Sequence, residues 1–173
     1  MSHKISNKKI ALLGVLGAQA LALSFMENLI PPLPGLPPGA KPGFSNIVTM
    51  YTAATMGLGE ALYITAIKAI FAGLTRGATA FFMSLSGGLL STFVMFGLMQ
   101  IKKQPFGIAG IAVAAAVAHN IGQLLAAIFI TGTISVAGYA PLLLLFSIIT
   151  GLVTGTVLKI VMPALEKQSR FLS

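Results

Sequence analysis

The sequence contains no cysteine and no aspartate, and it has only three acidic residues in 173. Without cysteine, the chain can form neither a disulfide nor a thiolate metal site. Charged residues make up 8% of the chain, whereas soluble domains contain about 25%. The hydrophobic fraction is 56%. This composition indicates an integral membrane protein, with most of the chain in the lipid bilayer.

The apolar stretches predict the helices, because a membrane span needs about 20 apolar residues. We expect one all-α membrane domain over residues 1–173, a bundle of six transmembrane helices. They would lie at about 9–30, 44–59, 61–75, 79–100, 107–130 and 138–162, with glycine and proline at the joints. The start of the chain also resembles a signal peptide, but a multi-span protein needs no cleaved signal. We therefore interpret it as a retained first helix.

Basic residues are distributed unevenly around these spans. One side of the membrane would carry only Lys41 and Arg76, and the other side would carry Lys4, Lys8, Lys9, Lys102, Lys103, Lys159, Lys167 and Arg170. The positive-inside rule then predicts that both termini are cytoplasmic. Because the basic residues flank apolar segments instead of forming one patch, the net charge of +8 does not indicate a nucleic-acid partner.

A proline-rich loop, PPLPGLPPGAKPG at residues 31–43, separates the first two expected helices. Proline fixes its own φ and lacks an N–H donor, so this loop cannot become helix. It would lie on the outer side, as a cover over the mouth of the bundle or as a plain stiff connector.

Lys68 falls near the middle of the third expected helix, in ALYITAIKAIFAGL. A charge at mid-membrane costs about 3 kcal/mol, so such residues face the bundle interior and often mark a site. Lys68 would either bind a ligand or form a structural pair with Glu27 or Glu60.

A second polar group, His119, Asn120 and Gln123, lies mid-way along the fifth expected helix. His119 and Gln123 are four residues apart and share a face. The group would bind a ligand or hydrogen-bond neighbouring helices. One buried histidine without carboxylates or cysteine offers too few ligands for a metal.

The outer mouth of the bundle would gather Glu27 and Asn28 before the proline-rich loop, and Lys41 and Asn46 within or after it. The excess of cations there favours an anionic ligand, although Arg76 also suits ordinary interface anchoring. Methionines would supply apolar lining, with Met50, Met56, Met83 and Met95 as candidates.

Small residues recur every four positions on the first helix, at Gly14, Ala18 and Ala22. Such a stripe lets another helix pack closely.

Enzymatic chemistry has little support in the sequence. There is no G-x-x-x-x-G-K-[ST] loop to cradle ATP, and the serines in FFMSLSGGLLS have no histidine nearby in sequence.

Four stretches together resemble a known family: MENLIPPLPGLPPGAKPGFSNIVTM, FFMSLSGGLLSTFVM, GIAVAAAVAHNIGQLLAA and PLLLLFSIITGLVTG. They look like the family called heptaprenyl diphosphate synthase component I, or the Gx transporter family. This family is grouped with the S components of bacterial energy-coupling factor (ECF) transporters. The first of its two names conflicts with the residues, because prenyl diphosphate synthases bind magnesium through clustered aspartates and this chain has none. At Lys68 the resemblance predicts arginine, so a bidentate grip on an anion is not available there.

The resemblance implies a binding subunit in the bacterial cytoplasmic membrane, not an enzyme, and no cofactor of its own. A T component would dock at Gly14, Ala18 and Ala22, and two ATPase subunits would use the ATP. The substrate would be a vitamin-like, isoprenoid-like or quinone-precursor-like anion, bound by Glu27, Asn28, Lys41, Asn46, Lys68, Met83, His119, Asn120 and Gln123. The alternatives are a non-catalytic membrane subunit of a prenyl diphosphate or quinone biosynthetic enzyme, and a scaffold that binds no ligand.

Overall fold

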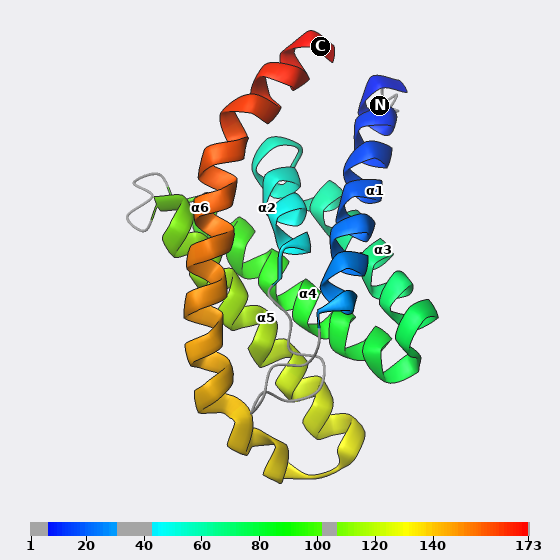
Figure 1. Ribbon diagram of the computed structural model, residues 1–173, viewed down its shortest axis with the longest axis vertical. Coiled ribbons are helices and arrows are strands. Elements are labelled where there is room, and N and C mark those ends of the chain that lie inside the picture. The colour runs from blue at the N-terminus through cyan, green and yellow to red at the C-terminus, as the bar shows by residue number, and fades with distance from the viewer. Residues whose placement is uncertain (1–6, 31–42, 102–106, 173) are drawn as a thin grey trace.

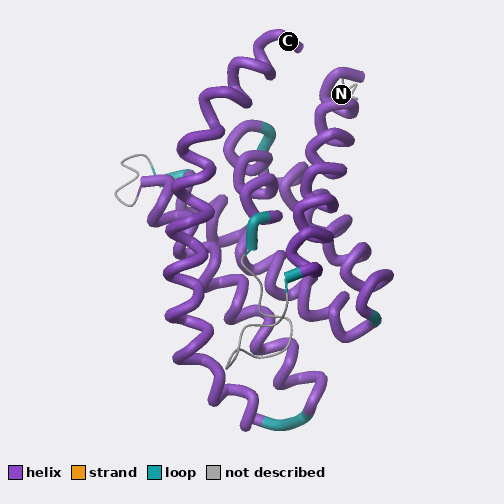
Figure 2. The backbone as a smooth tube through the Cα atoms, viewed as in Figure 1, coloured by secondary structure: helices purple, strands orange, loops and turns teal. Residues whose placement is uncertain are grey.

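The computed structural model describes residues 7–30, 43–101 and 107–172, with side chains described as far as residue 163. All regular structure in these ranges is helical, as Figure 2 shows. Six α-helices and one short 3₁₀ helix follow in order: α1 (Asn7–Leu29), α2 (Ser45–Thr55), α3 (Leu58–Arg76), α4 (Ala78–Met99), α5 (Gly107–Thr131), η1 (Ile134–Tyr139) and α6 (Ala140–Leu172). The all-α prediction is therefore confirmed for the described part of the chain.

Five of these helical segments are long and apolar enough to cross a membrane: α1, α3, α4, α5 and the segment Ile134–Pro163. Only 22–33% of each of these spans is buried inside the molecule, so most of their apolar surface faces outward, as lipid contact requires. The protein is a multi-pass membrane protein.

The second helix differs from its prediction. It ends at Thr55 and not near residue 59, which leaves 11 residues. At 1.5 Å per residue it is about 17 Å long, much less than the hydrocarbon core of about 30 Å. The described structure therefore supports five of the six expected spans. The helix α2 is too short to cross the membrane by itself.

The last helix also differs, because it continues to Leu172 through Pro163, where the sequence predicts an end. Proline holds φ near the helical value but removes one backbone hydrogen bond. It therefore weakens a helix without always ending it.

Both termini lie at the same end of the molecule (Figure 1). The joint between α3 and α4 lies toward the other end and consists of Gly77 alone. Gly77 has φ +90°, a conformation that side chains with a Cβ rarely adopt. This one-residue joint lets α4 begin immediately and cross the molecule beneath the start of α2.

Small residues bring α4, α5 and α6 close together. A Cβ added at Gly122 of α5 would lie 2.7 Å from the carbonyl oxygen of Ser86 in α4, and one added at Gly151 of α6 would lie 2.5 Å from Cα of Val113 in α5. Van der Waals contact at this range is the main attraction between helices in lipid. The positions of the α5 and α6 side chains are therefore set by backbone-to-backbone packing.

Candidate functional site

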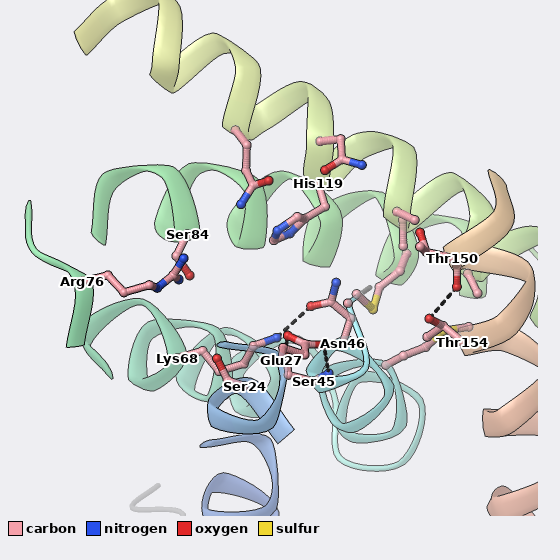
Figure 3. Close-up of a pocket in the computed structure, with 18 residues that line it drawn as sticks. Ser24, Glu27, Ser45, Asn46, Lys68, Arg76, Ser84, His119, Thr150 and Thr154 are labelled. Carbon is pink, nitrogen blue, oxygen red and sulfur yellow. Dashed lines mark hydrogen bonds between the residues drawn. The ribbon is translucent and has the colours of Figure 1, made fainter. Parts of the chain in front are cut away.

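A cavity lies among the helices, and all six α-helices contribute to its walls (Figure 3). Its empty space is about 780 Å³, including open solvent. The lining residues are Ser24, Glu27, Gly43, Ser45, Asn46, Met50, Lys68, Arg76, Ser84, Met95, Ala112, Ala115, Ala116, His119, Asn120, Gln123, Thr150 and Thr154.

The end of α1 is tied to the start of α2 by Glu27, which is only 4% exposed. Its Oε1 accepts a hydrogen bond from the backbone N–H of Ser45 at 3.0 Å, and its Oε2 accepts one from the Ser45 hydroxyl at 3.4 Å. The first N–H groups of a helix have no partner within the helix, and a carboxylate there also complements the helix dipole. Glu27 thus lines the cavity while both of its oxygens hold the first turn of α2.

Lys68 of α3 is 9% exposed and reaches the same turn of α2. Its ammonium donates to Oδ1 of Asn46 at 2.7 Å and to the hydroxyl of Thr49 at 3.4 Å. Both acceptors are neutral, so they satisfy two of the three ammonium hydrogens without balancing the charge.

No carboxylate in the described part of the chain lies within 4.0 Å of the Lys68 ammonium. The expected alternative of a pair with Glu60 is wrong, because Glu60 forms an ion pair with Lys9 of α1. Glu27 lines the same cavity, but neither of its carboxylate oxygens lies within 4.0 Å of the Lys68 ammonium. Lys68 is a buried cation in a cavity wall with one hydrogen left to donate.

Arg76 adds a second cation to the same wall. It lies eight residues after Lys68 on α3, which places both on one face of the helix. Its side chain extends over the cavity toward Ser84 of α4 (Figure 3). The sequence predicts Arg76 as one of the cations at the mouth, with interface anchoring as the alternative, and the structure includes it in the lining of the cavity.

The predicted polar group on α5 does gather at the cavity, since His119, Asn120 and Gln123 all line it. Asn120 also links α5 to α6, because its Nδ2 donates a hydrogen bond to the hydroxyl of Ser147 in α6 at 2.7 Å. His119 and Gln123 pack against Gly87 of α4, where an added Cβ would lie 2.7 Å from the His119 carbonyl oxygen and 2.7 Å from Gln123 Cγ. His119 Nδ1 is buried there with no hydrogen-bond partner in the described structure.

Two predicted site residues are not brought to the cavity. Met83 and Asn28 are not among the lining residues, and the methionines that do line it are Met50 and Met95. Lys41, and with it most of the proline-rich loop, lies outside the described residues.

Several lining residues escape sequence reasoning, among them Ser45, Ser84, Thr150 and Thr154. One signal was available for the two threonines, because each is followed by glycine and the pairs Thr150-Gly151 and Thr154-Gly155 are spaced by four residues. Spacing by four places both threonines on one helix face. Within the described ranges, no three histidine or acidic side chains converge as metal ligands.

The first helix has two faces of different character. Its buried residues are Leu16, Gly17, Ala20, Ser24 and Glu27. Gly14, Ala18 and Ala22 are all exposed on the other side, and a Cβ added at Gly14 would meet nothing within 4 Å. The predicted docking stripe is thus exposed in the described structure.

Comparison with known families identifies the chain. The family model described as heptaprenyl diphosphate synthase component I matches residues 16–161. The chain belongs to this family. The matched residues include part of every helix that lines the cavity. The resemblance drawn from the four sequence stretches is confirmed. No curated protein matches the sequence.

A solved structure described as the "Structure and mechanism of the S component of a bacterial ECF transporter" has the same fold. The TM-score is 0.63, and the match covers 96% of this chain and 98% of that chain at 19% sequence identity. At this identity the likeness shows the fold alone. This member of the family therefore has an S-component fold.

Proposed function

We propose that this protein is the substrate-binding S component of an ECF-type importer. It takes a small amphipathic anion, vitamin-like, isoprenoid-like or quinone-precursor-like, from outside a bacterial cytoplasmic membrane. Both termini are cytoplasmic, and the protein catalyses no reaction itself. The S-component fold supports this proposal.

One observation carries the proposal: Lys68 is buried in the cavity wall, and no carboxylate of the described residues lies within 4.0 Å of its ammonium. A buried charge is costly unless it is paired, and charged residues inside membrane bundles commonly mark substrate pathways. Arg76 lines the same cavity, where Glu27 is the one acidic residue among the described lining residues. Two cations thus face one carboxylate, and an anionic group of the substrate would balance the remaining positive charge.

The experiment is native mass spectrometry of the full chain, purified in detergent after co-expression with a T component and two ATPase subunits. We expect a complex of these subunits and a bound small molecule on the wild-type chain. Lys68→Met removes the charge, keeps most of the side-chain length and should abolish the bound molecule. Lys159→Met, at an exposed lysine of α6, is the matched control. Equal occupancy in both variants would contradict the assignment of Lys68.

Docking is proposed at the exposed stripe of α1, where Gly14, Ala18 and Ala22 permit close approach of another helix. Ala18→Leu should prevent assembly with the T component and leave binding of the small molecule intact. Ala78→Leu places the same bulk at an exposed alanine at the start of α4, and should assemble normally. An intact complex with Ala18→Leu would exclude this contact.

The family description favours a second candidate, a non-catalytic membrane subunit of a prenyl diphosphate or quinone biosynthetic enzyme. This candidate predicts co-purification with a soluble synthase in place of the ATPase subunits. The same experiment therefore separates the two functions.

A further inference from the structure

The α6 wall of the cavity presents hydrogen-bond acceptors. The hydroxyl of Thr150 donates to the carbonyl oxygen of Phe146 at 3.0 Å, and the hydroxyl of Thr154 donates to that of Thr150 at 2.7 Å. A hydroxyl has a single hydrogen and two lone pairs. Because each hydrogen is spent inside the helix, both threonines offer the cavity lone pairs only.

Ser147, which also belongs to α6, continues this pattern and contacts Asn120 of α5. Ser147 donates its one hydrogen to the carbonyl oxygen of Leu143 at 2.6 Å, so its oxygen can only accept from Asn120. This network fixes the orientation of the Asn120 amide, with its nitrogen toward Ser147. One of the two amide hydrogens of Asn120 is thus engaged between helices, and the thioethers of Met50 and Met95 are at most weak acceptors.

The α3 wall has the opposite character. Lys68 and Arg76 carry donors and no acceptors. Figure 3 places these two cations on one side of the cavity and Thr150 and Thr154 on the other. Ala112, Ala115 and Ala116 of α5 add an apolar surface to the lining.

We propose that the cavity selects a short two-ended ligand, with an anionic group at one end and hydroxyl or amino donors at the other. The anion lies against Lys68 and Arg76, and the donors bind the lone pairs of Thr150 and Thr154. A site built to hydrogen-bond a donor discriminates against analogues that lack it. This inference rests on the proposed function and narrows it, because an isoprenoid phosphate has no donor in its apolar tail.

The probe for the test is the pooled small-molecule extract of the cells that express the protein, applied to the full chain in detergent. The retained compound is eluted, and its exact mass in H₂O and in D₂O gives the number of exchangeable hydrogens. We expect at least one exchangeable hydrogen beyond those of the acid group. A compound without one would overturn the inference and leave the proposed function intact.

Variants of α6 give the second readout, the dissociation constant of the retained compound. Thr150→Val and Thr154→Val keep the side-chain shape, and each should weaken binding by about 3- to 10-fold, the effect of one neutral hydrogen bond. Thr156→Val is the matched control, since its hydroxyl also donates within the helix, to Leu152 at 2.8 Å, but it is exposed outside the cavity. It should bind as the wild type does.

Two further results separate this inference from the function on which it rests. Wild-type affinity in both Thr150→Val and Thr154→Val, combined with loss of binding in Lys68→Met, would overturn the two-ended ligand alone. Retention of no compound by the wild-type chain, or full affinity in Lys68→Met, would overturn the proposed site and this inference together.

Discussion

Replacing Gly151 by alanine should force α6 away from α5. The added Cβ would lie 2.5 Å from Cα and 2.9 Å from the backbone nitrogen of Val113. Ordinary contact begins at 3.4 Å, so the helices must separate by about 0.9 Å (3.4 − 2.5) along this direction, if ordinary spacing is to be restored. The obstacle is backbone, which cannot rotate aside as a flexible side chain does.

The magnitude follows from two opposing effects. Overpacking costs about 1–3 kcal/mol, and a backbone obstacle belongs at the upper end. Alanine is favoured over glycine inside a helix by about 1 kcal/mol. We therefore expect Gly151→Ala to lower the free energy of unfolding by about 1–2 kcal/mol.

Gly97→Ala is the control, because a Cβ there meets nothing within 4 Å and only the helix preference remains. Since the chain has no cysteine and no tryptophan, thiol-reactive dyes and tryptophan fluorescence do not apply. Loss of circular dichroism at 222 nm on heating, or of the monodisperse peak after heating, reports unfolding instead. If Gly151→Ala proved as stable as Gly97→Ala, the close packing of α5 and α6 argued here would be refuted.

Two more substitutions test the contacts that hold α1. Glu27→Leu leaves the N–H and hydroxyl of Ser45 without their acceptor, and each buried unsatisfied group costs about 1–3 kcal/mol, so the melting temperature in detergent should fall clearly. Glu60→Gln removes the charge paired with Lys9 near the surface, where such pairs contribute about 0–1 kcal/mol, so its melting temperature should change little and should approach that of the wild type as salt is added. Lys159→Gln, an exposed lysine of α6, controls for loss of one surface charge; a large salt-independent drop in Glu60→Gln would contradict this account.

The helices were predictable because a membrane allows few solutions. Every backbone polar group must be satisfied within the lipid, so an apolar run of sufficient length becomes a helix. Lys68 and His119 were predictable for a related reason. Placing a polar side chain in lipid costs free energy, so polar residues within an apolar helix face the interior of the bundle. Both residues line the cavity.

What the sequence does not reveal is the register between helices. Glu27 and Asn28 are adjacent, yet only Glu27 lines the cavity, since neighbours on a helix point about 100° apart. Met83 and Met95 are equally apolar, and only the way α4 packs decides that Met95 faces the interior. The hydroxyls of Thr150 and Thr154 also look like routine helix-bonded side chains in the sequence. Their role depends on the wall that α5 and α6 form together.

The arrangement of α1 connects the two halves of the proposed function. One face of this single helix carries Ser24 and Glu27 into the cavity wall, and the other carries the exposed stripe with Ala18. Because a helix is stiff along its axis, a partner helix that packs on the stripe is only one helix diameter, about 10 Å, from the wall.

A ligand that adds an anion beside Lys68 also changes the surroundings of the first turn of α2, which Glu27 holds. We therefore predict that the bound molecule influences assembly with the proposed partner through the Glu27–Ser45 contact. Glu27→Leu should then weaken this influence as well as lower the stability. Assembly that depends on the bound molecule equally in Glu27→Leu and in the wild type would mean that the two sites communicate by another route.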